Sequence, residues 1–472
     1  MNMYPVPARA TESSSAEVTR QLASAAAALQ YEDLSAEAVE IVKQCVLDTI
    51  GVAIAGHANE ATRSVYQLCA DEGAAPAASF LCLGVKGSVR QAALVNGTAA
   101  HALDFDDCCL TMPGHVSAVV LPAVLALGER YAASGKDLIT AFAAGFEAGC
   151  SLGAAISPGH YDAGFHATGT NGAVAAAAGA ARLLGLPADQ TADALSIAAT
   201  TAAGLKGLFG TPCKPFHAGK AAENGVQAAL LAQKGFVTRR DAIECRQGYA
   251  MTHSPDFNPE RVADRPQPGG MHLFDNLFKY HAACYGTHGA IECAIELRGR
   301  LNGNTADIER LVLEVAQEND KTCNIAAPAN ASEARFSLCH TIAMVLCGHD
   351  TGMADDYGET SLGDAEVVRI RQHVDVRFFP ARNIAHSRLT VALRDGSTLS
   401  VEMDAGKPNE DLAYQRQRLQ KKFLRLTTPI IGEEAARALV AAIDTLESSP
   451  AVGELAAKPA PVPAPSGSIA GL

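Results

Sequence analysis

Apolar residues recur at helical spacing through the first half of the chain. Between Ser35 and Ala55, Val42, Val46 and Ile50 form a stripe four residues apart, which is typical of a helix packed against other helices. Similar patterns predict helices at about 15–28, 89–104, 118–133, 136–153, 173–186, 188–203 and 219–233. The segment at 173–186 is so poor in large side chains that we expect a central helix, closely approached by its neighbours. No convincing strand pattern appears before about residue 264.

The pattern changes after the segment PQPGG at 266–270. One more helix is predicted at about 286–301, and alternating segments follow at 311–317 and 373–379. Two further alternating segments flank Asp395 and Gly396, a dipeptide typical of a two-residue hairpin turn. We therefore expect a small α+β unit at about 271–403.

The last part of the chain returns to the helical pattern, at about 409–426 and 433–447. The sequence thus predicts a mainly α fold, in which a large all-helical domain carries a smaller inserted α+β domain. The helical domain should comprise 15–268 and 405–449, and the α+β domain 269–404. The tail at 450–472 contains AKPAPVPAPSGS and is predicted to be disordered.

Length and composition agree with this organisation. A chain of 472 residues is too long for one ordinary core, so two domains are expected. Apolar residues make up 48% of the chain, aromatic residues only 5%, and Trp is absent, which favours closely packed helices over an aromatic-rich β-sandwich. The net charge of −13 argues against non-specific binding to nucleic acid, which needs a basic surface.

Neither a secretory leader nor an uninterrupted apolar run of about 18 residues is evident, so we expect a cytoplasmic protein without a membrane span. The 13 cysteines are scattered through helical patterns and form no CxxC pair. Most are expected to be reduced core residues rather than zinc ligands or disulfide partners.

The stretch HALDFDDCCLTMPGH, residues 101–115, concentrates ionisable side chains. His101, Asp104 and Asp107 are spaced three apart, so a continuing helix would crowd them on one face. Crowded acids raise one another's proton affinity, which makes an acid–base centre plausible. The alternative is that the acids merely end a helix and enter a turn. With His115 they could also ligate a metal, but no HExxH-type pairing exists, and we predict no metal.

Basic side chains stand at three other predicted helix starts. These are His166, then Lys214, His217 and Lys220 in the loop before the 219–233 helix, and finally His288. Helix N-termini carry unpaired N–H groups and a partial positive charge, so such loops suit carboxylates. Each residue could instead be an ordinary cap or a solvated side chain. Cys108, Cys109 and Cys284 could supply a nucleophile, although core packing is the simpler interpretation.

Four segments together resemble the MmgE/PrpD family. They are HALDFDD followed by GHVSAVVLPAVLALGE, GFHATGTNGAVAAAAGAARLLGL, CKPFHAGKAAENGVQAALLAQKGF and KYHAACYGTHGAIECAIEL, and LDTIGVAIAG and EARFSL are also similar. The resemblance spans about 15–450. It implies a homodimer and an active site between the two domains that uses no metal or organic cofactor.

Carried over by motif, the resemblance places Asp104, His115, His166, Lys214 and His288 in the active site. His101, Cys108, His217 and Lys220 are expected to bind substrate. Cys108 occupies a position where relatives acting on aconitate-like substrates often have Thr. His115 is followed by Val116 rather than Pro, and Ala282 also replaces a common Pro. These departures leave the exact substrate open.

The expected activity is that of a lyase, a dehydratase or decarboxylase, acting on a small di- or tricarboxylate of the methylcitrate or aconitate type. Lys214 and His166 would bind carboxylates and stabilise developing negative charge. Asp104, His115 and His288 would position the substrate and exchange protons, with Asp106 and Asp107 structural. The alternatives are an epimerase or racemase of a dicarboxylate such as iminodisuccinate, or a carboxylate-binding homologue without catalysis.

Overall fold

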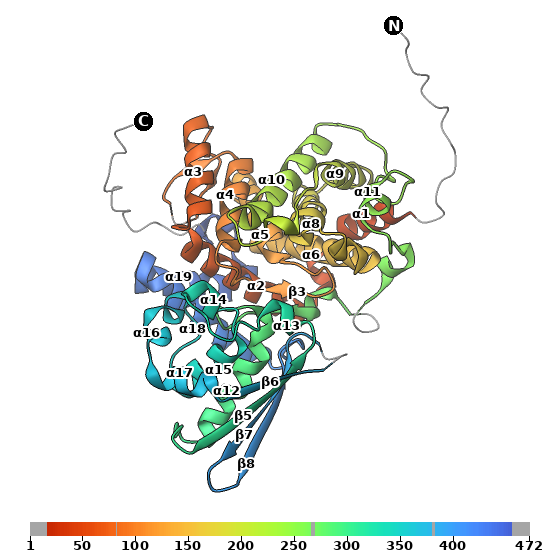
Figure 1. Cartoon of the computed structure of the whole chain (residues 1–472). Coiled ribbons are helices and arrows are strands. Elements are labelled where there is room, and N and C mark those ends of the chain that lie inside the picture. Colours follow the sequence, from red (N-terminus) through yellow and green to blue (C-terminus); the bar gives the residue numbers. More distant parts are fainter. Residues whose placement is uncertain (1–16, 82, 266–269, 380–382, 456–472) are drawn as a thin grey trace, which may run out of the picture.

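The computed structural model describes residues 17–81, 83–265, 270–379 and 383–455 (Figure 1). The predicted boundary segment falls mostly at 266–269 and most of the predicted tail at 456–472, so both lie outside the described residues. The described chain is mainly helical with a smaller α+β part, which confirms the predicted fold class.

The first part of the chain is a packed assembly of helices, drawn from red to green in Figure 1. Its members are α1 (Val18–Ala28), α2 (Ala36–Gly56), α3 (Glu60–Glu72), α4 (Val89–His101), α5 (Ser117–Tyr131), α6 (Gly135–Ile156), α7 (Gly159–Asp162), α8 (Ala167–Leu183), α9 (Ala188–Thr201), α10 (Cys213–Gln233) and α11 (Tyr249–His253).

The small-residue helix α8 lies at the centre of this assembly, as predicted. It packs against α5, α6, α9 and α10, and its residues from Ala167 to Ala181 are all buried. Side chains no larger than valine let neighbouring backbones approach: a Cβ added to Gly225 of α10 would lie 2.4 Å from that of Ala176. The apolar helix α6 is long enough to cross a membrane, but 94% of its most apolar window is buried inside the protein, as in a core helix.

Helix α10 begins earlier than predicted. Cys213 is its first residue, so Lys214, His217 and Lys220 lie on its first turns rather than in a loop. Pro215 is typical of a loop, but here it lies in the first turn of the helix. It is tolerated because N–H groups in the first turn have no intrahelical acceptor to lose.

The α+β part is built on a four-stranded sheet of order β6-β5-β7-β8. Its strands are β5 (Ile308–Ala316), β6 (Val374–Phe379), β7 (His386–Leu393) and β8 (Thr398–Asp404). The β5–β6 pair is parallel, whereas β7 runs antiparallel to β5 and β8. Asp395 and Gly396 form the β7–β8 turn with Gly396 at φ +85°, which confirms the predicted hairpin.

Helices accompany the sheet below the helical assembly in Figure 1. Helix α12 (His288–Arg300) packs on β7 and β8, and α15 (Leu338–Leu346) packs between α12 and α17 (Ala365–Gln372). The short helices α13 (Asn319–Thr322), α14 (Ala331–Ala334) and α16 (Glu359–Leu362) lie in the connections.

The chain then returns to its first part. Helices α18 (Leu412–Ile431) and α19 (Glu433–Asp444) pack against α2. The prediction of disorder from residue 450 is wrong for 452–455, which form a short 3-10 helix with Val452 and Leu455 buried. Apolar side chains at these two positions let 452–455 pack before the proline-rich composition begins.

Four very short strands were not predicted. Strands β1 (Ala78–Ser79) and β2 (Lys86–Gly87) pair with each other, and β3 (Cys108–Cys109) pairs with β4 (Asn276–Leu277). Two residues are too few to show an alternating pattern. The β3–β4 pair joins the acidic stretch at 101–115 to the chain that leads to Lys279.

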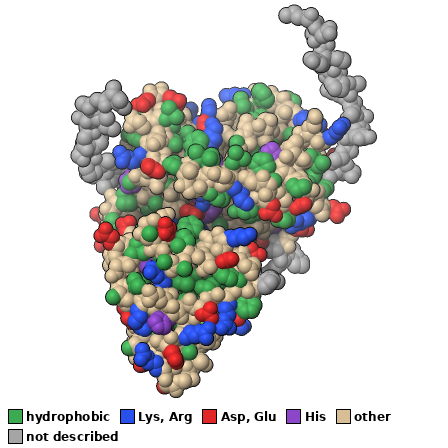
Figure 2. Space-filling view, in the orientation of Figure 1, with side chains coloured by type: hydrophobic (Ala, Val, Ile, Leu, Met, Phe, Trp, Pro, Cys, Tyr) green, Lys and Arg blue, Asp and Glu red, His purple; other side chains and the backbone are tan. Residues whose placement is uncertain are grey.

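Charged side chains of both signs are intermixed over the face shown in Figure 2. Acidic and basic groups alternate on the helical part and on the α+β part alike. The negative net charge is therefore not gathered into one patch on that face.

We expect Gly219→Ala to destabilise the helical assembly. A Cβ at Gly219 would lie 2.2 Å from both Leu94 O and Thr98 Oγ1 of α4, and such overpacking typically costs about 1–3 kcal/mol. Urea denaturation measures the loss. Gly207→Ala is the matched control, because its Cβ would meet nothing within 4 Å. Equal stability of the two variants would contradict this account of the α4–α10 contact.

Candidate active site

A cavity of about 720 Å³ lies between the helical assembly and the α+β part. Its walls include the end of α4, the starts of α8 and α10, and the segment 279–285. Five of the residues selected from the sequence line it: His101, Asp104, His115, His166 and Lys214. The first and last of them, His101 and Lys214, are 113 positions apart in the chain. The tertiary fold therefore brings these residues together.

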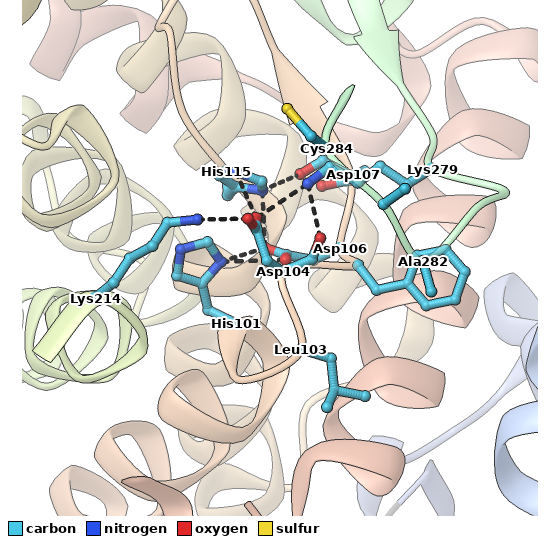
Figure 3. A network of polar contacts seen from close by, with 12 residues as sticks. His101, Leu103, Asp104, Asp106, Asp107, His115, Lys214, Lys279, Ala282 and Cys284 are labelled. Atoms are coloured by element: carbon cyan, nitrogen blue, oxygen red, sulfur yellow. Dashed lines mark hydrogen bonds and ion pairs between the residues drawn. The ribbon is translucent and has the colours of Figure 1, made fainter. Parts of the chain in front are cut away.

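Asp104 is the centre of the polar network shown in Figure 3. It follows the end of α4 in the left-handed conformation, with φ +52°, which Asp tolerates better than most residues. Lys214 Nζ lies 2.8 Å from its Oδ2 and Lys279 Nζ 3.0 Å from its Oδ1. Burial acts to raise the pKa of Asp104, but these two ammonium groups hold that pKa well below its usual range. Asp104 is therefore a stable carboxylate.

His115 faces Asp104 with one ring nitrogen and the protein backbone with the other. Its Nε2 lies 3.6 Å from Asp104 Oδ1, while its Nδ1 lies 2.8 Å from Asp107 O and 3.0 Å from Asp106 Oδ2. A carbonyl and a carboxylate both accept, so Nδ1 must carry the hydrogen. In the neutral ring the free lone pair then belongs to Nε2, on the Asp104 side. This geometry suits His115 Nε2 to accept and return a proton.

Asp106 holds two histidines rather than one. His101 Nδ1 lies 2.9 Å from its Oδ2, and both side chains of this pair are fully buried. Burial acts to raise the pKa of Asp106, but His101 and His115 bring it well below its usual range. Burial conversely lowers the pKa of His101 to about 4. Asp106 thus fixes the orientation of the two rings, whose centroids are 4.5 Å apart.

His166 and His217 form a second pair at the cavity wall. Their Nδ1 atoms are 3.1 Å apart, and a hydrogen bond between two ring nitrogens requires at least one neutral ring that accepts. Burial, followed by the charges of His101 and Lys214, lowers the pKa of His166. His166 is therefore a neutral hydrogen-bonding group in this structure and not a fixed cation.

Asp107 differs from the other two acids of the stretch. Its Oδ2 accepts from Ser117 Oγ at 2.6 Å and from Asn276 Nδ2 at 2.7 Å, whereas its Oδ1 is buried without a hydrogen-bond partner among the described residues. Burial, and then the charge of Asp48, raises the pKa of Asp107 to about 7. Among the three acids of this stretch, Asp107 is the one that can be protonated near neutral pH.

Four residues selected from the sequence do not line this cavity: Cys108, His217, Lys220 and His288. Lys220 lies six residues beyond Lys214 on α10, which turns it to another face, where it pairs with Glu223 at 2.7 Å. His217 does not line the cavity, but its Nδ1 contacts that of His166, which does.

The other two are buried in the framework. Cys108 pairs with Leu277 in the β3–β4 ladder, and burial raises the pKa of its thiol. His288 lies in a separate cavity of about 460 Å³ with Tyr285 and Glu292. Burial, followed by the charge of His281, lowers its pKa well below the usual range.

Most residues that line the cavity were not assigned to the site from the sequence, and three of them bear on its chemistry: Lys279, Arg335 and Cys284. Lys279 contacts Asp104, as described above. Arg335 donates from Nε to Ala282 O at 2.6 Å and from Nη2 to Leu103 O at 2.9 Å, so it ties the two walls together. Cys284 was weighed only as a core residue or a nucleophile. All three lie in motifs quoted above, KYHAAC and EARFSL, so motif membership was the available signal.

The cluster also has the donor atoms of a metal site. One ligand atom each from His101, Asp104, Asp106 and His115 lies within 4.8 Å of the others. However, two ammonium groups occupy the Asp104 carboxylate, and Asp106 is engaged by both imidazoles. A bound cation would have to displace these contacts and oppose both lysine charges. The donor set therefore suits an organic anion beside the lysines better than a metal.

The arrangement can perform two chemical tasks. Lys214, Lys279 and Arg335 present positive charge to one cavity and can bind more than one carboxylate. His115 Nε2 can exchange a proton beside that charge, where a developing anion on carbon would be stabilised.

We expect the stability of the wild type to fall relative to Asp107→Asn as the pH rises from about 4 to 7. The pKa of Asp107 is raised to about 7 in the folded state and is about 3.9 when unfolded. The folded state therefore binds more protons in this window, and the stability that this acid contributes is lost as the pH rises through 7. Urea denaturation of both proteins across the window measures the difference, and a difference independent of pH would contradict the assignment.

Comparisons with known proteins identify the family of this chain. The MmgE/PrpD N-terminal domain model matches residues 20–262, and the MmgE/PrpD C-terminal domain model matches 281–448. The chain is 26% identical to the cis-aconitate decarboxylase of Homo sapiens over 451 residues, covering 91% of this chain and 92% of the relative. It is 28% identical to that of Aspergillus terreus, with 70% and 71% covered.

A third relative carries a different activity in its name. The mitochondrial 2-methylcitrate dehydratase of Yarrowia lipolytica is 26% identical, with 87% of this chain and 81% of the relative covered. The two family models together span most of the chain and both of its structural parts. This chain therefore belongs to the MmgE/PrpD family.

Proposed function

We propose that the protein is a lyase that releases carbon dioxide or water from a small di- or tricarboxylate of the cis-aconitate or methylcitrate type, without a metal or organic cofactor. The observation that carries the proposal is the Asp104 cluster, in which Lys214, Lys279 and His115 converge on one carboxylate inside the cavity. The named activities of the relatives, two decarboxylases and a dehydratase, support the substrate class.

Substrate binding would redistribute the contacts of Asp104. An incoming carboxylate can accept hydrogen bonds from the Lys214 and Lys279 ammonium groups. Each ammonium group has three hydrogens, so it can still donate to Asp104 as well. Arg335, which also lines the cavity, offers a position for a second carboxylate. Burial strengthens these charge-assisted bonds relative to water, so the cavity can neutralise a substrate with several negative charges.

The chemical step then needs charge stabilisation and one proton transfer. In a decarboxylation, the bond to the leaving carboxylate breaks, and its electron pair remains on carbon and spreads into the neighbouring unsaturated acid. The two ammonium groups stabilise that charge. Protonated His115 Nε2 delivers the proton to carbon and becomes neutral. In a dehydration, neutral His115 Nε2 would instead remove the proton next to a carboxylate and pass it to the departing hydroxyl group, which leaves as water.

We expect Lys214→Met and His115→Gln each to lower kcat/KM by about 10²–10⁴-fold, the usual range for loss of an acid–base or charge-stabilising group. The assay incubates the protein with citrate, 2-methylcitrate, cis-aconitate and a source of iminodisuccinate and identifies products by NMR. Lys220→Met is the matched control, because this lysine lies on the same helix outside the cavity, and its activity should match the wild type. Turnover of folded Lys214→Met within about tenfold of wild type would refute the assignment. Deuterium incorporation or inversion without loss of a group would favour an epimerase.

We expect dialysis against EDTA to leave turnover unchanged. The four potential ligands of the cluster are already engaged by lysines and by one another. Activity and metal content are measured before and after dialysis. Loss of activity that zinc or iron restores would contradict the cofactor-independent mechanism.

A further inference from the structure

Lys422 of α18 lies immediately behind the active site. Its side chain is 6% exposed, and its Nζ donates to Asp48 Oδ1 at 2.6 Å, to Phe105 O at 2.6 Å and to Lys279 O at 2.8 Å. An ammonium group has three hydrogens, so every donor of Lys422 is used. The ammonium also lies 3.9 Å from the centre of the Phe105 ring.

Two of these acceptors belong to the backbone of the site. The Phe105 carbonyl stands between Asp104, which binds both cavity lysines, and Asp106, which orients His101 and His115. The Lys279 carbonyl belongs to the residue whose own ammonium contacts Asp104 Oδ1 at 3.0 Å and Asp104 O at 2.7 Å. A single atom, Lys422 Nζ, therefore holds both the acidic loop at 104–107 and the segment that carries Lys279.

The loop needs such support. Asp104 has φ +52°, a conformation that persists in a non-glycine residue only when its surroundings hold it. Asp48 supplies the charge that lets Lys422 be buried there, and the negative charges of Asp106 and Asp107 act on the same ammonium. Because α2 carries Asp48 and α18 carries Lys422, the support exists only after the C-terminal helices have docked.

We propose that Lys422 is a positioning residue of the active site, whose ammonium group fixes the backbone on both sides of the Asp104–Lys279 contact. It does not line the Asp104 cavity and touches no substrate there. Its effect on the proposed lyase reaction is indirect, so this inference rests on the proposed function for its kinetic test but not for its structural one.

The test compares three variants with the wild type. Asp48→Asn removes the nearest charge partner, but its amide oxygen and both carbonyls can still accept from Lys422, and the charges of Asp106 and Asp107 remain to balance the ammonium. Asp48→Asn with Lys422→Met removes those bonds as well and leaves no unpaired buried charge, so it avoids the unfolding expected of Lys422→Met alone. Lys43→Met is the matched control for helix docking. Lys43 of α2 is as buried as Lys422, and it bonds Asp444 O at 2.9 Å and Glu447 at 3.1 Å, far along the chain from the acidic loop.

Amide hydrogen exchange at 103–109 requires no substrate. We expect the double variant to exchange at least about tenfold faster there than Asp48→Asn, with Lys43→Met close to wild type in this segment. The kcat of the double variant should fall about tenfold to a hundredfold below that of Asp48→Asn, as for a misplaced catalytic group. The acidic limb of its pH–kcat profile should move to higher pH, because losing a buried cation favours the protonated state of neighbouring groups.

Loop exchange and kcat in the double variant equal to those of Asp48→Asn would overturn the proposal. A loss of kcat in Lys43→Met equal to that of the double variant would also overturn it. Lys422 would then act only by docking the C-terminal helices, as Lys43 does. A wild type that turns over none of the candidate acids would refute the proposed function, while the exchange measurement would still decide the role of Lys422.

Discussion

Burial of opposite charges in a nearly apolar interior is the constraint on which the rest of this structure depends. Four carboxylates, those of Asp48, Asp104, Asp106 and Asp107, lie beside three lysines, Lys214, Lys279 and Lys422. Three ammonium groups balance three carboxylates. The remaining acid is Asp107, whose pKa is raised to about 7 by burial and by Asp48. Removing charges from water is costly, so the network survives only with this pairing and with its hydrogen bonds satisfied.

This requirement explains why distant parts of the chain must meet at one place. Asp48 comes from α2, and the three other acids follow α4. Lys214 lies in the first turn of α10, Lys279 follows β4, and Lys422 lies on α18. Helices α18 and α19 return to α2 after the α+β part has been completed. Glycines and alanines at the α4–α10 and α8–α10 contacts allow this convergence, because larger side chains would separate the helices. Packing of small residues thus sets the distances on which the charge network relies.

The surroundings of each site residue decide whether it is charged, neutral or able to exchange a proton. Lys214 and Lys279 pair with the Asp104 carboxylate in the cavity, whereas burial lowers the pKa values of His101 and His166 and makes them neutral hydrogen-bonding groups. His115 differs because its Nδ1 faces acceptors and its Nε2 faces Asp104. A single side chain is thereby oriented for proton exchange among groups of fixed charge. The cavity thus offers cations for an anion and one ring nitrogen for proton exchange, the two features that the proposed elimination next to a carboxylate needs.

The amino-acid sequence alone determined the order of helices and strands and the segments that form the cavity. Helical spacing predicted the helical assembly, Asp395-Gly396 predicted the hairpin, and the motifs named the segments that supply the cavity. These features depend on neighbours in sequence, which a linear pattern records. The tertiary structure alone decided which side chains of those segments face one another. It turned Lys220 and His288 away from the cavity, buried Cys108 in a short ladder, and brought Lys279 and Arg335 into the walls. It also placed Lys422 behind the site across more than 300 residues of chain. Such contacts arise from packing and charge pairing between elements far apart in sequence, and no local spacing encodes them.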